Sequence, residues 1–151
     1  MTNRQQLLQK VDEARNELWH ALDQLDDATT IYPGWQKREF FAHIAGWEAM
    51  VFDSIRAQIS GVAPLDHAYR GIESANERFV AVRKSLIVQD ARLECEVNRF
   101  AILQLLATIK NDDEPIMLPW GSETVVEFLE GAIRHERDHA EDIQHLIGKP
   151  L

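Results

Sequence analysis

Residues 133–143 of the chain read Ile133-Arg134-His135-Glu136-Arg137-Asp138-His139-Ala140-Glu141-Asp142-Ile143. Two of them, His135 and His139, are four residues apart, and residues at this spacing lie one above the other on a helix. Two imidazoles placed in this way can bind one metal ion from one side. Because Glu136 follows the first histidine, the segment also has the H-E-x-x-H form of zinc proteases. The segment therefore predicts a helix that presents metal ligands on one face.

The rest of the predicted last helix, from Thr124 to Gly148, indicates which way these histidines point. On a helical wheel, at about 100° per residue, His135 and His139 lie about 40° apart at one edge of the apolar stripe. The solvated face holds Glu127, Glu130, Arg134, Arg137 and Glu141. The histidines are therefore expected to face the core of the protein rather than solvent.

Glu136 lies in the middle of the apolar stripe, between Leu129 and Ala140. A carboxylate there is costly unless it is paired, hydrogen-bonded or protonated. Two interpretations stay open. In one, Glu136 forms a salt bridge or reaches outward to solvent. In the other, it orients a ligand histidine or acts as a catalytic base, since carboxylates commonly accept the free N–H of a metal-bound imidazole.

The third ligand is expected to be His43, in the predicted second helix. His43 shares its apolar face with Phe40 and Trp47, and Gly46 allows another backbone or a ligand to approach closely. The remaining histidines are on polar faces or in a predicted loop: His20, His145 and His67. One histidine from the second helix and a pair from the last make a three-imidazole site with an open coordination position, as in catalytic zinc sites.

A zinc-protease function has less support than metal binding itself. Zincin proteases typically take their third ligand downstream of the motif, but residues 140–151 offer only the carboxylate of Asp142 on the histidine side of the helix. The chain also lacks a predicted strand that could hold an extended peptide substrate. The motif is therefore interpreted as metal-binding without being proteolytic.

Hydrophobic periodicity predicts helices along the chain and no strand of convincing length. The expected helices cover residues 3–26, 36–61, 72–85, 89–110 and 124–148, and the third and fourth are either separate or one helix kinked near Ser85. Thr2 with Gln5 and Thr124 with Glu127 form capping boxes. The pattern predicts an all-α four-helix bundle with one long connection, as a single domain over residues 1–151.

Two segments carry further expectations about packing. The apolar stripe of the helix over 89–110 is expected to be Leu93, Val97, Phe100, Leu103 and Leu106. Residues 111–121 are the longest irregular stretch, and their two prolines exclude an ordinary helix interior. We expect this stretch to be a loop that closes over the site.

Composition and charge limit the classes of partner. The chain of 151 residues has a formal net charge of −9, which disfavours nucleic acid or an anionic membrane as the main partner. The lone Cys95 excludes an internal disulfide and is expected to be buried. No apolar run is long enough for a membrane span, and the polar N-terminus shows no signal peptide. These features predict a cytoplasmic protein.

With these residues, the chain resembles the DinB/YfiT-like superfamily of metal-binding four-helix bundles. The resemblance covers nearly the whole chain, and its two most specific stretches are residues 34–48, which contain His43, and residues 133–143. In that family the second helix supplies one histidine and the last helix supplies an H-x-x-x-H pair. The resemblance therefore implies an up-down-down-up bundle that holds a divalent ion, zinc or nickel, on His43, His135 and His139.

The resemblance also implies a range of activities. Members of the family include thiol-dependent S-transferases, mycothiol-dependent isomerases and, in a ClbS-like branch, a cyclopropane hydrolase that protects its producer from a genotoxin. Thiol-transferase-like members often carry Gly-Gln shortly after the second histidine, where this chain has Ala140-Glu141. In this respect the tail is more similar to ClbS-like sequences.

These observations predict a metal-dependent hydrolase or thiol S-transferase that acts on a small organic or electrophilic substrate. Glu136 is the candidate catalytic residue, and Trp35, Trp47 and Trp120 are candidates for the pocket wall. The alternative is a binding protein that sequesters a metal or a toxin without turnover. A homodimer is also consistent with an apolar helical bundle.

Overall fold

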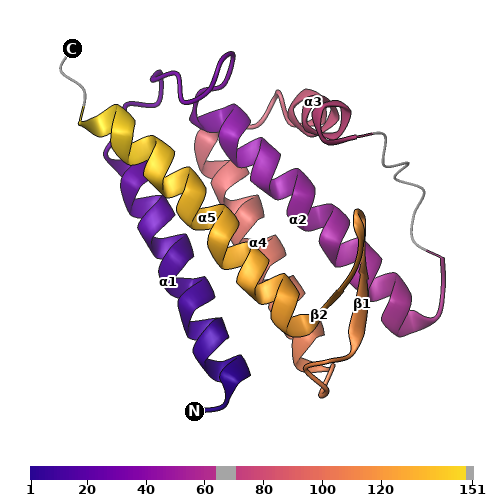
Figure 1. Ribbon diagram of the computed structural model, residues 1–151. Helices are drawn as coiled ribbons and strands as arrows, with labels where there is room; N and C mark the ends of the chain where they lie inside the picture. Colours follow the sequence, from indigo (N-terminus) through magenta and orange to yellow (C-terminus); the bar gives the residue numbers. More distant parts are fainter. Residues whose placement is uncertain (64–70, 149–151) are drawn as a thin grey trace.

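The computed structural model describes residues 1–63 and 71–148, and five helices account for most of them. These are α1 (Asn3–Asp23), α2 (Lys37–Ser60), α3 (Ile72–Val82), α4 (Val88–Ala107) and α5 (Val125–Ile147). α1 packs against α5 and α2 packs against α4. Figure 1 shows α1 and α5 running in one direction and α2 and α4 in the other. The predicted up-down-down-up bundle is confirmed, and its long connection, between α2 and α4, contains α3.

The helix ends follow the local signals in the sequence. Thr2 and Thr124 form the two predicted capping boxes, in which each threonine side chain accepts a hydrogen bond from the N3 backbone N–H. Gly61 ends α2 in the left-handed conformation, with φ of 68°. α3 and α4 are separate helices. The predicted loop after α2, including His67, lies largely outside the described residues.

The expectation of no strand is wrong for one segment. β1 (Pro115–Leu118) and β2 (Gly121–Thr124) form an antiparallel hairpin between α4 and α5. Each strand has four residues, which is too short to give a clear alternating pattern. The two-residue turn, Pro119-Trp120, is followed by Gly121, whose φ of 140° favours glycine. The predicted irregular loop is therefore partly a hairpin with Trp120 in its turn.

The predicted apolar stripe of α4 is also wrong over most of its length. Leu93, Val97 and Phe100 are 55%, 57% and 66% exposed. The buried face carries Ala91, Cys95 and Ile102, together with Leu106 from the predicted stripe. The prediction chose the outer face because its apolar residues are larger. The inner face has smaller residues, Ala91 and Cys95, and includes Arg99. The homodimer remains a prediction. The exposed side chains of Leu93, Val97 and Phe100 are a candidate contact surface for it.

α3 packs closely against α2 at Gly46. A Cβ atom on Gly46 would overlap with the ring of Phe79, so glycine is required for α3 to approach this closely. Gly46 was expected to admit another backbone or a ligand, and the group that approaches it is the side chain of Phe79. Cys95 is fully buried, as expected. None of the described helices is both long and apolar enough to cross a membrane.

Candidate metal centre and the adjoining cavity

The three predicted ligands come together between α2 and α5. The ring centroid of His43 lies 5.9 Å from that of His135 and 5.6 Å from that of His139. The Nε2 atoms of His135 and His139 are 3.1 Å apart. One ligand atom from each residue lies within 4.8 Å of the other two. The sequence prediction of a three-histidine cluster is confirmed.

His43 is held in one orientation by a residue of α3. Its Nδ1 lies 2.7 Å from Oδ1 of Asn76, which also accepts a hydrogen bond from the indole N–H of Trp47. Because a carbonyl oxygen only accepts, Nδ1 of His43 carries the proton and Nε2 has the free lone pair. That Nε2 atom is buried and has no hydrogen-bond partner among the described residues. A buried acceptor without a partner is costly, and a metal ion would satisfy it.

His139 is oriented by a second outer partner. The hydroxyl of Tyr32 donates to Asp142 over 2.6 Å and lies 2.7 Å from Nδ1 of His139. Since the hydroxyl proton is used by Asp142, Tyr32 accepts from the Nδ1–H of His139. Burial and the nearby Asp142 carboxylate raise the pKa of Tyr32, so this donor keeps its proton. The arrangement directs Nε2 of His139 toward His135.

The three imidazoles are neutral at physiological pH. Burial lowers the pKa of His43 to about 4. Burial, together with the other two histidines, lowers the pKa of His139 to about 3. Burial is also the main cause that lowers the pKa of His135, although its side chain is the most exposed of the three. Neutral imidazoles have the lone pairs that metal binding requires.

These residues fit a divalent metal ion. Imidazole nitrogens bind zinc at ~2.0–2.1 Å and suit zinc, nickel, copper and iron. The unpartnered Nε2 of His43 and the outer partners on His43 and His139 are the usual accompaniments of such ligands. Three protein ligands also leave room for a substrate, as in catalytic rather than structural sites.

The lowered pKa values predict that the metal-free protein is less stable in mild acid. The unfolded chain takes up protons on these histidines below about pH 6.5, whereas folded His43 and His139 stay neutral down to about pH 4 and about pH 3. Folding stability should therefore fall as the pH drops from about 7 to about 5. Urea unfolding of metal-free protein at the two pH values measures this. The double variant His43→Gln/His139→Gln should lose less, and an equal loss would contradict the assignment.

Removal of the outer partner of His43 should weaken metal binding. Asn76→Ala leaves Nδ1 of His43 without its acceptor, so the ring is free to turn and metal affinity should fall about 10- to 100-fold. Asn76→Asp keeps an acceptor and should retain most of the affinity. Titration against a competing chelator gives both affinities. If Asn76→Ala binds metal as tightly as the unmodified protein, Asn76 does not orient a ligand.

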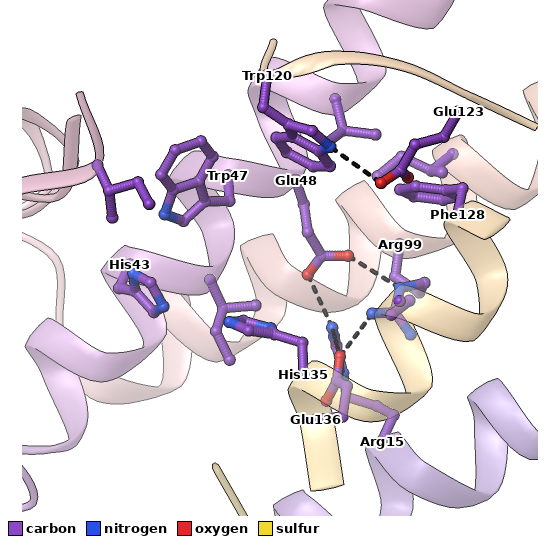
Figure 2. Close-up of a pocket in the computed structure, with 16 residues that line it drawn as sticks. Arg15, His43, Trp47, Glu48, Arg99, Trp120, Glu123, Phe128, His135 and Glu136 are labelled. Carbon is purple, nitrogen blue, oxygen red and sulfur yellow. Dashed lines mark hydrogen bonds and ion pairs between the residues drawn. The ribbon is translucent and has the colours of Figure 1, made fainter. Parts of the chain in front are cut away.

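A cavity of about 370 Å³ opens next to the histidines (Figure 2). His43 and His135 are part of its lining, and Trp47 and Trp120 lie in its wall with ring centroids 6.0 Å apart. The indole N–H of Trp120 donates to Glu123 of β2. Trp35, the third predicted wall residue, packs against the ring of His43 at 5.0 Å and is not among the described residues that line this cavity.

A buried ionic network forms the side of the cavity beyond His135. Arg15 donates to Glu48 over 2.9 Å and to Glu136 over 2.6 Å. Arg99 donates to Glu48 over 3.0 Å and to Glu136 over 2.6 Å. Each carboxylate therefore binds both guanidinium groups, and the four residues come from α1, α2, α4 and α5. We refer to Arg15, Glu48, Arg99 and Glu136 as the ionic quartet.

This arrangement bears on the two interpretations of Glu136. The salt bridge is present, Glu136 is 3% exposed, and Arg15 and Arg99 lower its pKa against the opposing effect of burial. Among the described residues no hydrogen bond joins Glu136 to His43, whose orientation comes from Asn76 instead. A carboxylate held by two arginines is a weak base. Its catalytic role stays a prediction that this geometry does not favour.

The other members of the ionic quartet were missed, although two of them, Arg15 and Glu48, leave a signal in the sequence. Arg15 lies between the buried Val11 and Leu18, at positions i−4 and i+3. Glu48 has the same relation to Ile44 and Val51, and Arg99 to Cys95 and Ile102. A charge at the centre of an apolar stripe is the signal that drew attention to Glu136. On α1 and α2 this signal marks Arg15 and Glu48, but Arg99 lies off the stripe predicted for α4, and only the observed burial of Cys95 and Ile102 places it at the centre of a buried face. Asn76 and Tyr32 carry no comparable signal.

Comparison with solved structures shows the same fold in proteins with very different sequences. A mycothiol-dependent maleylpyruvate isomerase matches with a TM-score of 0.73 and 15% identity, over 94% of this chain and 61% of that chain. An uncharacterized protein from Clostridium difficile 630 gives 0.79 and 12%, over 100% and 99% of the two chains. A protein from Streptococcus pneumoniae gives 0.77 and 13%, over 97% and 91%.

These likenesses, all at 15% identity or less, show that the fold is shared. The chain spans about three fifths of the isomerase chain, 61%. No protein-family model matches the sequence, and no curated protein matches it. The fold and the three-histidine cluster agree with the resemblance noted from residues 34–48 and 133–143.

Proposed function

We propose that this protein is a metal-dependent enzyme that acts on a small organic or electrophilic substrate, as a hydrolase or a thiol S-transferase. The observation that carries the proposal is the buried Nε2 of His43, which has no hydrogen-bond partner among the described residues and belongs to the three-histidine cluster. The adjoining cavity, which His43 and His135 help to line, offers space for a substrate beside this cluster. A structural metal site would use four protein ligands and need no such cavity.

The residues of the site divide the work between binding and orientation. His43, His135 and His139 would hold a divalent ion, zinc or nickel, and Asn76 and Tyr32 would fix the rings of two of them. When bound, such an ion supplies Lewis acidity that makes water or a thiol nucleophilic at neutral pH. The apolar wall with Trp47 and Trp120 limits the water that reaches the reacting atoms.

Two observations bear on the choice between the two reaction types. The shared fold with a mycothiol-dependent maleylpyruvate isomerase supports thiol-dependent chemistry. The sequence Ala140-Glu141, where thiol-transferase-like members of the resembling family often have Gly-Gln, favours hydrolysis and a ClbS-like activity. Because this chain spans only 61% of the isomerase chain, we give more weight to the residues of the chain itself.

Elemental analysis of the purified protein tests the proposal first. We expect about one zinc or nickel ion per chain, lost on treatment with a chelator and restored by adding the ion. The loaded and stripped forms are then assayed with an activated ester and with an electrophile plus a thiol. Turnover that depends on the ion supports an enzyme. Tight metal binding without turnover favours the sequestering alternative, and protein that binds no divalent ion contradicts both.

A further inference from the structure

The charged side chains of the ionic quartet, which line one side of the cavity, are bound to one another. Both oxygens of Glu48 accept hydrogen bonds, one from Arg15 and one from Arg99. Both oxygens of Glu136 accept from Arg15, and Arg99 donates to one of them. Figure 2 shows dashed lines that join these four residues beside His135. The quartet therefore offers an occupant neither an unbalanced charge nor a carboxylate oxygen without a donor.

The other polar groups of the lining do not favour an anion either. Nη1 of Arg15 and Nη1 of Arg99 have no partner among the described residues, but both atoms are buried and out of reach of an occupant. Glu123 is the further carboxylate among the described lining residues, and it accepts a hydrogen bond from the indole of Trp120. Because the quartet is balanced and the histidines are neutral, Glu123 leaves the metal-free cavity with an excess of negative charge.

Apolar side chains form the rest of the cavity. Trp120 and Ile72 are exposed and mark its opening, whereas Ile44, Val51 and Ile102 are buried and line its interior. Trp47 adds a second indole beside that of Trp120 (Figure 2). A volume of about 370 Å³ is near the lower end for ligand pockets, which suits a small molecule.

These walls reward an apolar occupant and penalise a charged one. An apolar molecule gains free energy because its own surface and the surface of the walls leave water together. A charged molecule loses its hydration and finds no unpaired opposite charge among the described lining residues, which is costly. A polar group of the occupant finds its place next to His43 and His135, the neutral polar residues of the lining.

We propose that the substrate of this site is a neutral molecule with an apolar, aromatic body and a polar reactive group at one end. The body lies against Trp47 and Trp120, because indole rings pack favourably with other aromatic rings. The reactive group lies beside His43 and His135. The inference deepens the proposed function and rests on it, because it takes the metal site to be the place where this substrate reacts.

The test compares two fluorescent probes that differ by a sulfonate group, neutral phenylnaphthylamine and anionic anilinonaphthalenesulfonate. In titrations of metal-free protein, the neutral probe should bind at least about tenfold more tightly, because the sulfonate loses hydration without compensation. Trp120→Ala removes an aromatic wall and should weaken binding of the neutral probe about tenfold. Phe100→Ala, which removes an exposed aromatic side chain outside the described cavity lining, should leave its affinity unchanged.

A second variant, Ala132→Phe, leaves the hairpin unaltered and places a ring in the cavity lining, so it should also exclude the neutral probe. Equal affinity for the two probes, or tighter binding of the sulfonate, overturns the inference. So does binding of the neutral probe that Phe100→Ala weakens and the two cavity variants do not, because the probe then lies on the outer face of α4. Metal content is measured separately, so failure to bind metal counts against the proposed function alone while the metal-free protein still reports the preference of the cavity.

Discussion

His135→Ala should abolish stoichiometric metal binding while leaving the bundle folded. The substitution removes one of three ligands, and its side chain is the most exposed of the three, so little packing is lost. The loss of affinity should exceed the ~10- to 100-fold that removal of an outer partner costs, because a direct bond to the ion disappears. Elemental analysis after dialysis measures the metal content, and circular dichroism checks the helix content.

His145→Ala is the matched control. His145 lies on the same helix, is exposed, and is the basic residue of its last turn. It should retain about one ion per chain. If His135→Ala also retains its metal, the three-histidine centre is not the binding site, and the 3.1 Å approach of the two Nε2 atoms is a histidine–histidine hydrogen bond only.

The sequence predicted the three ligands because their placement is a matter of local geometry. His135 and His139 are brought to one face by helical spacing, and His43 lies on an apolar face that must pack inward. The capping boxes at Thr2 and Thr124 fixed the beginnings of the two helices that flank each other in the fold. Each of these inferences needs only residues within a few positions of one another.

The outer partners could not be predicted in this way. Asn76 reaches His43 from α3, a short helix whose position depends on Phe79 packing over Gly46. Tyr32 reaches His139 from the turn before α2, 107 residues away in the chain. Neither contact follows from periodicity, because both depend on how distant segments pack. The prediction of which face of α4 is buried failed for a related reason. The buried face is polar where Arg99 joins the quartet.

Glu136→Gln should be among the most destabilising single substitutions in this protein. The carboxylate is 3% exposed and accepts hydrogen bonds from Arg15 and Arg99. Neutralising it leaves two buried guanidinium groups with one carboxylate, Glu48, and breaking a buried ion pair from one side costs ~3–5 kcal/mol. Urea unfolding at about pH 7 gives the difference in the free energy of unfolding. Glu141→Gln, on the solvated face of α5, should change it by less than about 0.5 kcal/mol.

The pH dependence of this difference identifies its cause. Arg15 and Arg99 lower the pKa of Glu136, so its contribution to stability is present above the pKa of an unfolded glutamate and is lost as the pH falls. The gap between the unmodified protein and Glu136→Gln should therefore narrow below about pH 4.3. A catalytic base gives the opposite result, in which the variant unfolds like the unmodified protein at every pH but no longer turns over substrate. That outcome would overturn the structural role and restore Glu136 as a candidate base.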